Sequence, residues 1–275
     1  MTKQLQRALF FLLASLGLLA VVTNHEVTAR QKEVIRVATD AATKPFTYRK
    51  KHSVTGYDIE VLKRVFKGSK KYRLSIEVVP FPSILAGIDA GRYQIGANNF
   101  GYSKERAEKY LFSSPISASH YALATKGKQQ YKSLADLSGK KTQGIAGSTY
   151  MLILEKWNQS HPDQKPIHLT YASESTPLTQ RLQLLENGQL DFLFYDAISL
   201  TTVAEEQGFD LHVTKLKEQA DTAKDGLEYY VFANDQKGKA LQRFVNKRLA
   251  KLKKSGQLRK LSQAFLGGDF VTKVN

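Results

Sequence analysis

Short apolar strands alternate with one-sided apolar helices in the first part of the chain. Three segments are apolar and alternating or rich in β-branched residues, which predicts strands at residues 34–39, 74–79 and 93–97. Two further segments carry apolar residues at helical spacing before a glycine stop, which predicts helices at residues 57–66 and 84–90. Strands and helices that alternate at these distances indicate βαβ units around a parallel sheet.

The same order of elements restarts near residue 141. Strands are predicted at residues 141–145, 167–171 and 190–195. Helices are predicted from a cap at 147–149 to about residue 159, and at 176–186. Each half contains a helix, a glycine stop and a strand that enters a polar loop, at residues 90–95 and again at 187–192. Two similar half-units predict two similar lobes that face each other.

The end of the chain is expected to return to the first half-unit. Residues 229–233 form an apolar segment much like 121–124, and each lies where the chain would pass between lobes. Two amphipathic helices follow, at residues 238–254 and 258–266. We therefore predict an α/β fold with two Rossmann-like lobes joined by a two-strand hinge, whose crossing segments lie near 122–127 and 224–229. Lobe 1 takes residues 30–123 and 228–275, and lobe 2 takes residues 124–227.

Residues 1–29 have the features of a secretory signal peptide. Lys3 and Arg7 precede an apolar stretch at residues 8–22, and residues 27–29 form a small-x-small cleavage site. At about 1.5 Å per residue the apolar stretch reaches about 22 Å, which is shorter than a hydrocarbon core of roughly 30 Å. We expect an exported protein with a cleaved signal, and an uncleaved N-terminal anchor is the alternative.

Charge and cysteine content narrow the expected location of the exported protein. The chain has no cysteine, so neither disulfides nor a lipid anchor on cysteine is expected. It carries 41 basic and 25 acidic residues, a formal net charge of +16. Such a charge on an exported protein predicts retention at the cell surface by anionic polymers or lipid headgroups. A solvated basic surface without a specific partner is the alternative.

Motifs for catalysis, metals and nucleic acids are not found in the sequence. The six histidines include no H-E-x-x-H pair, and the chain has no G-x-S-x-G, Walker loop or G-x-G-x-x-G. No basic motif with interleaved aromatic residues indicates nucleic-acid binding. We expect neither cofactor nor metal, and a binding protein rather than an enzyme. An enzyme on the same fold, such as a dehydratase relative, is the weaker alternative.

Four segments in a fixed order carry a family resemblance. They are residues 36–40 followed by 44–46, residues 56–60, residues 103–106 followed by 111–115, and residues 249–266. From Val34 to about Asp269 the chain resembles family 3 of the extracellular solute-binding proteins of amino acid ABC transporters. Its character is closest to that of cystine-binding surface proteins of Gram-positive bacteria. The resemblance implies a type II periplasmic binding protein fold, a monomer that closes on an amino acid, and a permease as its partner.

Four residues are expected to hold the α-amino and α-carboxyl groups of the ligand. Arg106 matches a carboxylate with two donors and lies where the family keeps its ligand-binding arginine, although a surface arginine is the alternative. Ser148 and Thr149 begin a helix whose N-terminus favours an anion, or they simply cap it. Asp196 ends a strand where the family binds the ammonium, and an N-cap of the following helix is its alternative.

The remaining expected residues surround the ligand side chain. Phe81 matches a family aromatic, while Asn98, Asn99 and Gly101 lie where many relatives have small hydroxyl residues. Through side chains or backbone carbonyls, the two asparagines are expected to contact the ligand. Asp40 across the cleft suits a second cationic group, as in cystine, lysine or arginine, and we favour cystine. The alternative function is a surface adhesin that binds anionic cell-wall or matrix polymers.

Overall fold

The computed structural model describes residues 31–173, 176–216 and 224–272. The expected signal peptide, residues 1–29, lies outside the described residues. The account below concerns the unit that begins at Val34. In the described part of the chain, no helix combines the length and apolar character needed to cross a membrane.

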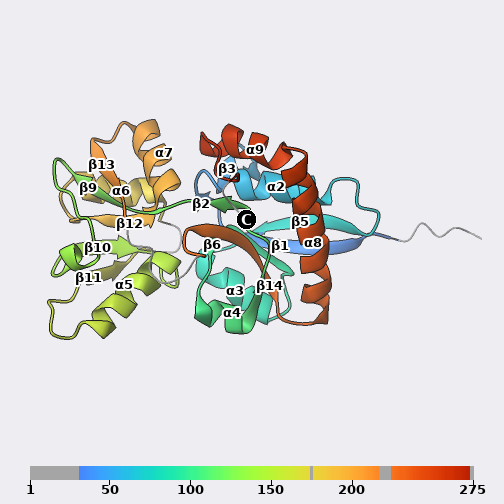
Figure 1. Ribbon diagram of the computed structural model, residues 1–275, viewed down its shortest axis with the longest axis horizontal. Helices are drawn as coiled ribbons and strands as arrows, with labels where there is room; N and C mark the ends of the chain where they lie inside the picture. The colour runs from blue at the N-terminus through green and yellow to red at the C-terminus, as the bar shows by residue number, and fades with distance from the viewer. Residues whose placement is uncertain (1–30, 174–175, 217–223, 273–275) are drawn as a thin grey trace, which may run out of the picture. The chain divides into compact units, whose positions relative to one another are not determined.

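The larger sheet contains residues from both ends of this unit. Its strands run in the order β5 (Tyr72–Val78), β1 (Glu33–Thr39), β6 (Ile95–Gly101), β14 (Leu227–Ala233) and β7 (Tyr110–Phe112), and β8 (Ser117–Ala118) pairs with β14 (Figure 1). Strands β1 and β6 are parallel, whereas β14 is antiparallel to its neighbours. A small antiparallel sheet adds β2 (Ala42–Thr43), β3 (Thr47–Lys50) and β4 (Ser53–Thr55). These sheets and their helices form lobe 1.

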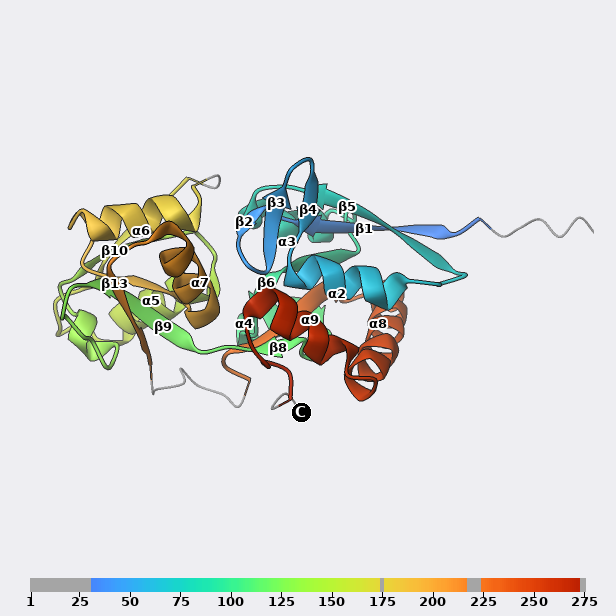
Figure 2. The same ribbon diagram turned by 90° about the horizontal axis from the view of Figure 1, so that it is seen from above.

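Helices cover both faces of the larger sheet. They are α2 (Tyr57–Phe66), α3 (Phe81–Asp89), α4 (Lys104–Lys109), α8 (Gln236–Lys254) and α9 (Gln257–Leu266). Helices α2, α8 and α9 pack side by side (Figure 2) and share one apolar cluster with Val37, while α3 shares another with Ala38. Neighbouring strand residues point to opposite faces, so the two clusters lie on the two sides of β1.

Gly56 sets the start of α2. Its φ of 120° is a conformation that side chains rarely adopt, and an added Cβ would lie 2.2 Å from the carbonyl oxygen of Phe46. Only glycine satisfies both conditions at this close approach. The helix then begins with acidic residues and ends with Lys63 and Arg64, in agreement with the helix dipole.

Lobe 2 contains the middle of the chain. Parallel strands β10 (Lys141–Gly144) and β11 (His168–Tyr171) lie beside the antiparallel strands β12 (Leu193–Asp196), β9 (Tyr121–Lys126) and β13 (Leu211–Lys215). The two sets are joined where the Asp191 N–H donates to the Lys141 carbonyl over 2.9 Å. Helices α5 (Thr149–Ser160), α6 (Leu178–Glu186) and α7 (Ala197–Gln207) pack on these strands, and residues 135–137 form a 3₁₀ turn. The α/β fold with two lobes therefore agrees with the sequence-based prediction.

The first crossing between lobes is not where the sequence predicted it. Residues 122–126 lie inside β9, the central strand of its sheet, and a boundary at 123/124 would cut this strand. The chain passes between the lobes at Ser119 and His120, between β8 and β9, and the Ser119 N–H donates to the Gly226 carbonyl over 2.7 Å. The prediction failed because a buried central strand and a hinge strand have the same apolar pattern. The second crossing includes residues 224–226, and β14 begins directly after it.

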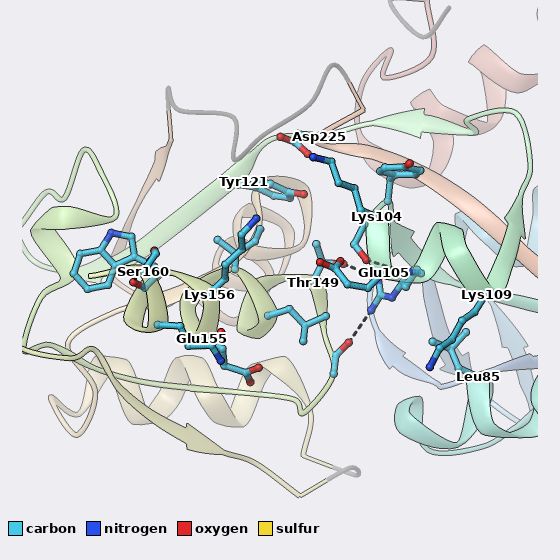
Figure 3. Close-up of a pocket in the computed structure, with 18 of the residues that line it drawn as sticks. Leu85, Lys104, Glu105, Lys109, Tyr121, Thr149, Glu155, Lys156, Ser160 and Asp225 are labelled. Atoms are coloured by element: carbon cyan, nitrogen blue, oxygen red, sulfur yellow. Dashed lines mark hydrogen bonds between the residues drawn. The ribbon is translucent and has the colours of Figure 1, made fainter. Parts of the chain in front are cut away.

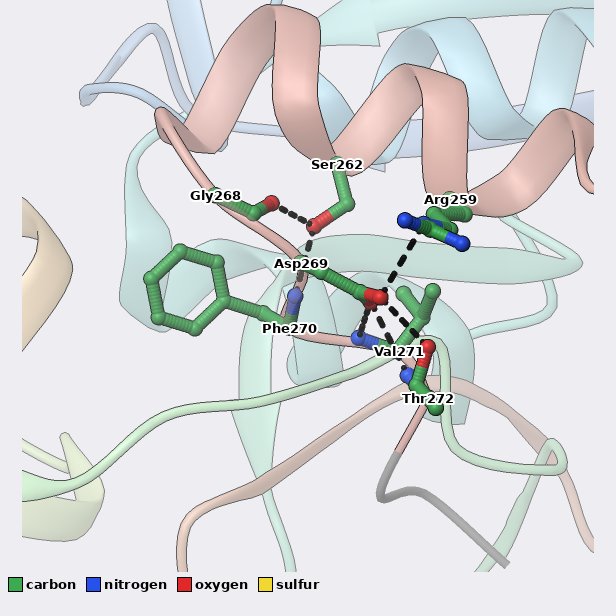
Figure 4. Close-up of polar contacts among 7 residues, drawn as sticks. All are labelled: Arg259, Ser262, Gly268, Asp269, Phe270, Val271 and Thr272. Carbon is green, nitrogen blue, oxygen red and sulfur yellow. Dashed lines mark hydrogen bonds and ion pairs between the residues drawn. The ribbon is translucent and has the colours of Figure 1, made fainter.

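The tail after α9 is fastened to lobe 1 by a compact set of polar contacts (Figure 4). The hydroxyl of Ser262 donates to the Gly268 carbonyl over 2.6 Å and accepts from the Phe270 N–H over 2.9 Å. The Phe270 carbonyl accepts from the N–H of Ala118, which lies next to the first crossing. Asp269 accepts from the N–H groups of Val271 and Thr272 and pairs with Arg259 at 3.2 Å.

Candidate functional site

All nine predicted site residues line two small cavities that neighbour each other between the lobes. The main cavity, about 30 Å³, is lined by Asp40, Phe81, Asn98, Asn99, Arg106, Ser148 and Thr149. The minor cavity, about 10 Å³, is lined by Asn99, Gly101, Thr149 and Asp196. Small-molecule sites usually enclose several hundred Å³. Neither cavity, as the lobes stand here, has the volume that a solute the size of an amino acid needs.

Arg106 is buried and bridges the two lobes. It lies in α4, whose first turn is set by Ser103, the acceptor of the Arg106 N–H at 3.1 Å. Its Nη1 donates to the Gly101 carbonyl over 3.0 Å and to Thr149 Oγ1 over 2.8 Å, and its Nη2 donates to the Gly147 carbonyl over 2.7 Å. Burial lowers the pKa of Arg106 to about 10, so the side chain remains a cation at neutral pH.

The guanidinium of Arg106 keeps donors for a ligand. Three contacts use three of its five N–H groups, which leaves Nε–H and one Nη2–H, a pair that matches a carboxylate. Among the described residues no carboxylate lies within ion-pair distance of it, although the side chain is only 6% exposed. A buried charge without a partner is costly, so this site suits an anion.

The start of α5 faces the same cavity from lobe 2. Ser148 caps this helix by accepting from the Met151 N–H over 3.3 Å, so the expected capping role is observed. Thr149 follows and supplies the hydroxyl that accepts from Arg106. The positive end of the helix dipole and the guanidinium therefore act on the same cavity, and both favour an anionic group there.

Asp196 lies at the end of β12 and caps α7. Its Oδ1 accepts from the Ser199 N–H over 2.7 Å, which is the N-cap that the sequence left as an alternative. The residue is 2% exposed, and burial raises the pKa of its carboxyl to about 6. It lines the minor cavity, so one carboxylate can cap the helix and attract a cationic group.

The structure places the Asn98 side chain in an internal network. Its Oδ1 accepts from Thr39 Oγ1, the Asp40 N–H and Thr47 Oγ1, and its Nδ2 donates to Asp40 and Thr43. Every polar group of the amide has a partner within the chain, so the side chain supports Asp40 and Thr43. Contact of Asn98 with a ligand, through its side chain or its backbone, stays a prediction.

Asp40 is the centre of the same network. Its Oδ1 accepts from the Ala42 N–H and Thr47 Oγ1, and its Oδ2 accepts from Thr43 Oγ1 and Asn98 Nδ2, all within 2.8–3.0 Å. Three of these donors serve Asp40 alone, and the single Thr47 hydroxyl hydrogen is shared with Asn98 Oδ1. Its charge still acts on the main cavity, but its hydrogen bonds hold the loop that carries Thr43.

Asn99, Gly101 and Phe81 shape the walls of the cavities. Asn99 has a φ of 49°, a left-handed conformation that asparagine tolerates, and its N–H donates to Asp58 Oδ2 over 2.7 Å. A Cβ at Gly101 would lie 3.1 Å from Thr149 Oγ1, so glycine allows the lobes to approach there. The ring of Phe81 stacks on Phe100 at a centroid distance of 5.3 Å.

Arg181 is a site residue that the sequence analysis missed. It comes from α6, is 3% exposed and lines the main cavity, and its Cζ lies 5.1 Å from the ring centroid of Tyr195. The buried face of α6 consists of Leu178, Arg181, Leu182 and Leu185. The available signal was an arginine at helical spacing among leucines, because a charge on a buried face needs a functional or pairing explanation.

A larger groove of about 890 Å³ adjoins Arg106 and Thr149 (Figure 3). Lysines at positions 104, 109 and 156 surround it, together with apolar residues of α5. Of the nine predicted residues only Arg106 and Thr149 line this groove. The groove lacks both Asp196 and Asp40, so it offers no carboxylate from the predicted set for an ammonium. The two enclosed cavities are therefore the candidate site.

Comparisons with known proteins identify the family of the chain. The family model of the bacterial extracellular solute-binding proteins, family 3, matches residues 35–268. The L-cystine-binding protein TcyJ of Bacillus subtilis is 28% identical over 251 residues, which cover 90% of this chain and 89% of that protein.

Two solved structures extend the comparison. One, from work on glutathione import in Gram-positive bacteria via GshT and the cystine ABC importer TcyBC of Streptococcus mutans, is 40% identical with a TM-score of 0.80. The match covers 87% of this chain and 97% of that one. An ancestral arginine-binding protein bound to arginine is 20% identical with a TM-score of 0.72, covering 84% and 97%. At that identity the second likeness concerns the fold alone.

Proposed function

The chain belongs to family 3 of the bacterial extracellular solute-binding proteins, and we propose that it is the substrate-binding component of an ABC transporter for cystine. One observation carries the proposal. Arg106 is a buried cation with two free donors and no carboxylate partner among the described residues, and Thr149 connects its cavity to the one lined by Asp196. A carboxylate site beside an ammonium site is what an α-amino acid requires.

In the proposed mechanism the ligand stabilises the closed arrangement of the lobes. Its carboxylate takes the free Arg106 donors near the start of α5, and its ammonium contacts Asp196. Arg106 belongs to lobe 1, whereas Thr149, Gly147 and Asp196 belong to lobe 2, so a ligand held by all of them favours closure. The ion pair Lys44–Glu206 at 2.5 Å also joins the lobes, but both side chains are about two-fifths exposed and it contributes little.

Cystine is our first candidate ligand and glutathione is the second. The cystine-binding TcyJ relative supports the first, and the 40% identical structure from work on glutathione import supports the second. Both molecules have an α-amino acid end and a further carboxylate. Both are therefore compatible with Arg106 and Asp196 and differ only at the far end of the cavity.

Titration calorimetry on protein freed of bound solute tests the proposal. We expect heat from binding of cystine or glutathione, and little from lysine, arginine or glutamine. Arg106→Gln should weaken the binding of the active solute by at least a hundredfold, because it removes a bidentate charged contact. If the protein binds neither cystine nor glutathione, the proposed ligand class is wrong.

We propose a binding role without catalysis, performed by a monomer that delivers its ligand to a permease. The family consists of solute-binding proteins, which supports this role. Recovery of chemically intact ligand after long incubation with the protein would agree with it. Steady conversion of the ligand into a product would contradict it and would revive an enzymatic function.

We further propose that helix α8 retains the exported protein at an anionic cell wall. Lys239, Arg243, Lys247 and Lys251 follow each other at every fourth position and are exposed, and α8 contains no acidic residue. Like charges at this spacing repel each other, so an anionic partner would relieve the repulsion. Part of the net charge of +16 therefore lies on one exposed face of α8.

Binding to poly(glycerol phosphate) tests this retention. Replacing Lys239, Arg243, Lys247 and Lys251 by glutamine should abolish it, and moderate salt should weaken the wild-type binding. Arg106→Gln is the matched control, because it removes a buried cation and should leave polymer binding unchanged. Undiminished binding by the fourfold variant would contradict the proposed surface.

A further inference from the structure

Arg181 is a second buried cation in the main cavity, and it forms no ion pair with a described residue. Its side chain is 3% exposed, and no carboxylate of the described residues lies within ion-pair distance. Its Nε is buried without a hydrogen-bond partner. The guanidinium lies with its Cζ 5.1 Å from the centroid of the Tyr195 ring, and the Tyr195 hydroxyl acts on it as a polar neighbour.

The acidic residue that lines the same cavity does not pair with Arg181. Asp40 lines the same cavity and acts on Arg181 electrostatically, but its oxygens already accept hydrogen bonds from Ala42, Thr43 and Asn98 and share the Thr47 hydroxyl with Asn98. An apolar residue would fill the leucine face of α6 without the cost of burying a charge. An anion from outside the chain, bound in the cavity beside Arg181, would offset the cost of burying this charge.

We propose that Arg181 receives a second carboxylate of the ligand, whose first carboxylate is bound by Arg106. The ligand class is thereby narrowed to amino acid derivatives with two carboxylates, such as cystine or glutathione. This inference rests on the proposed function of the site. Arg181 and Asp40 together present one positive and one negative charge, which suits the second zwitterionic end of cystine. Lysine and arginine would bring a cation towards Arg181 and are disfavoured.

A pair of matched ligands isolates the second carboxylate. L-Cystine and the mixed disulfide of cysteine with cysteamine share the disulfide, the first amino acid end and the second ammonium, and they differ by the second carboxylate alone. For the wild-type protein we expect cystine to bind at least tenfold more tightly than the mixed disulfide. If glutathione is the ligand that binds, glutathione and its glycine amide form the corresponding pair.

Substitution of Arg181 should remove this preference. In Arg181→Gln the affinity ratio between the two ligands should fall to within about threefold, chiefly because cystine binding weakens. In Arg106→Gln both affinities should fall together and the ratio should persist, since that residue contacts the shared end. Arg181→Lys keeps the positive charge but lacks the two parallel N–H donors of a guanidinium, so it should give an intermediate affinity ratio. This variant still tests the inference if Arg181→Gln does not fold.

The outcomes separate this inference from the proposed function. If the wild-type protein binds neither cystine nor glutathione, the proposed function is wrong. If it binds either one but the ratio is unchanged in Arg181→Gln and Arg181→Lys, only the role of Arg181 fails, and this side chain merely packs on Tyr195.

Discussion

The guanidinium of Arg106 donates to the hydroxyl of Thr149 over 2.8 Å, and this bond joins lobe 1 to lobe 2 directly beside the candidate site. Arg106 is 6% exposed and Thr149 is 9% exposed, so water does not readily replace the bond. The same contact thus orients the predicted carboxylate-binding donors and connects the lobes. A defect in it should affect ligand binding more than folding.

Thr149→Val should weaken ligand binding by about tenfold to a hundredfold. Valine keeps the shape of threonine but leaves one charged N–H of Arg106 without its acceptor, a loss of about 1.5–3 kcal/mol. Thr149→Ser retains the hydroxyl and is the matched control, with affinity within a few fold of wild type. Calorimetric titration with cystine or glutathione measures both. Equal affinities for the valine and serine variants would show that this bond does not support the site.

Ligand affinity should decrease as the pH falls through about 6. Burial raises the pKa of Asp196 to about 6, and only the ionised carboxylate attracts the ligand ammonium. The affinity is therefore greatest near pH 7 and falls by up to about tenfold per pH unit below 6. The ligand's own α-carboxyl and α-amino groups titrate near 3.5 and 8, outside this window.

Asp196→Asn separates this effect from other titrations. Asparagine can still cap α7, so the fold should persist, but it cannot attract the ammonium by charge. We expect weak affinity that changes little between pH 5 and 7, measured by titration calorimetry. If the affinity of the variant still falls at low pH as steeply as that of the wild type, a titratable group other than Asp196 causes the pH dependence.

Most of the fold follows from periodicity, whereas the crossings between lobes do not. The helix expected at 57–66 coincides with α2, because its apolar spacing and the glycine stop after it are both local signals. The expected hinge at 122–127 was wrong, because β9 is buried on both faces and carries the same apolar run as a linking strand. The short strands β2–β4 were also not foreseen, since two to four residues give too little pattern.

The candidate site was partly predictable for a different reason. Arg106, Ser148, Thr149 and Asp196 lie at helix starts or strand ends, where polar residues have recognisable local roles, and the fold brings these ends together. Arg181 lies in the middle of a helix, and only the packing of α6 shows that its charge is buried at the cavity. Which residues are already used by the chain, such as Asn98, also depends on tertiary contacts.

The stability of the protein should decrease as the pH rises from about 4 to about 7. Burial raises the pKa of Asp58 to about 7 and that of Glu228 well above its ordinary value. Between the unfolded and folded pKa values the folded state binds more protons, so the free energy of unfolding falls with rising pH. Each such group contributes a slope of up to about 1.4 kcal/mol per pH unit.

Asp58→Asn should flatten this decline without removing it entirely. The side chain is fully buried, its Oδ2 accepts from the Asn99 N–H and its Oδ1 is buried without a partner. Asparagine keeps an acceptor for Asn99 and carries no titratable charge, while Glu228 still titrates. Urea unfolding at pH 5, 6, 7 and 8 measures the slopes. An identical slope in wild type and variant would mean that Asp58 does not titrate in this range.

Ser262→Ala should destabilise the protein by about 1–3 kcal/mol. The hydroxyl is fully buried, donates to the Gly268 carbonyl and accepts from the Phe270 N–H, so alanine leaves both backbone groups without this partner. The matched control is Arg259→Gln, which removes the ion pair with Asp269 in the same tail. The Arg259 side chain is 60% exposed, so that loss should be clearly smaller than the loss in Ser262→Ala. Urea unfolding at one pH compares the two variants, and equal losses would show that Ser262 does not fasten the tail.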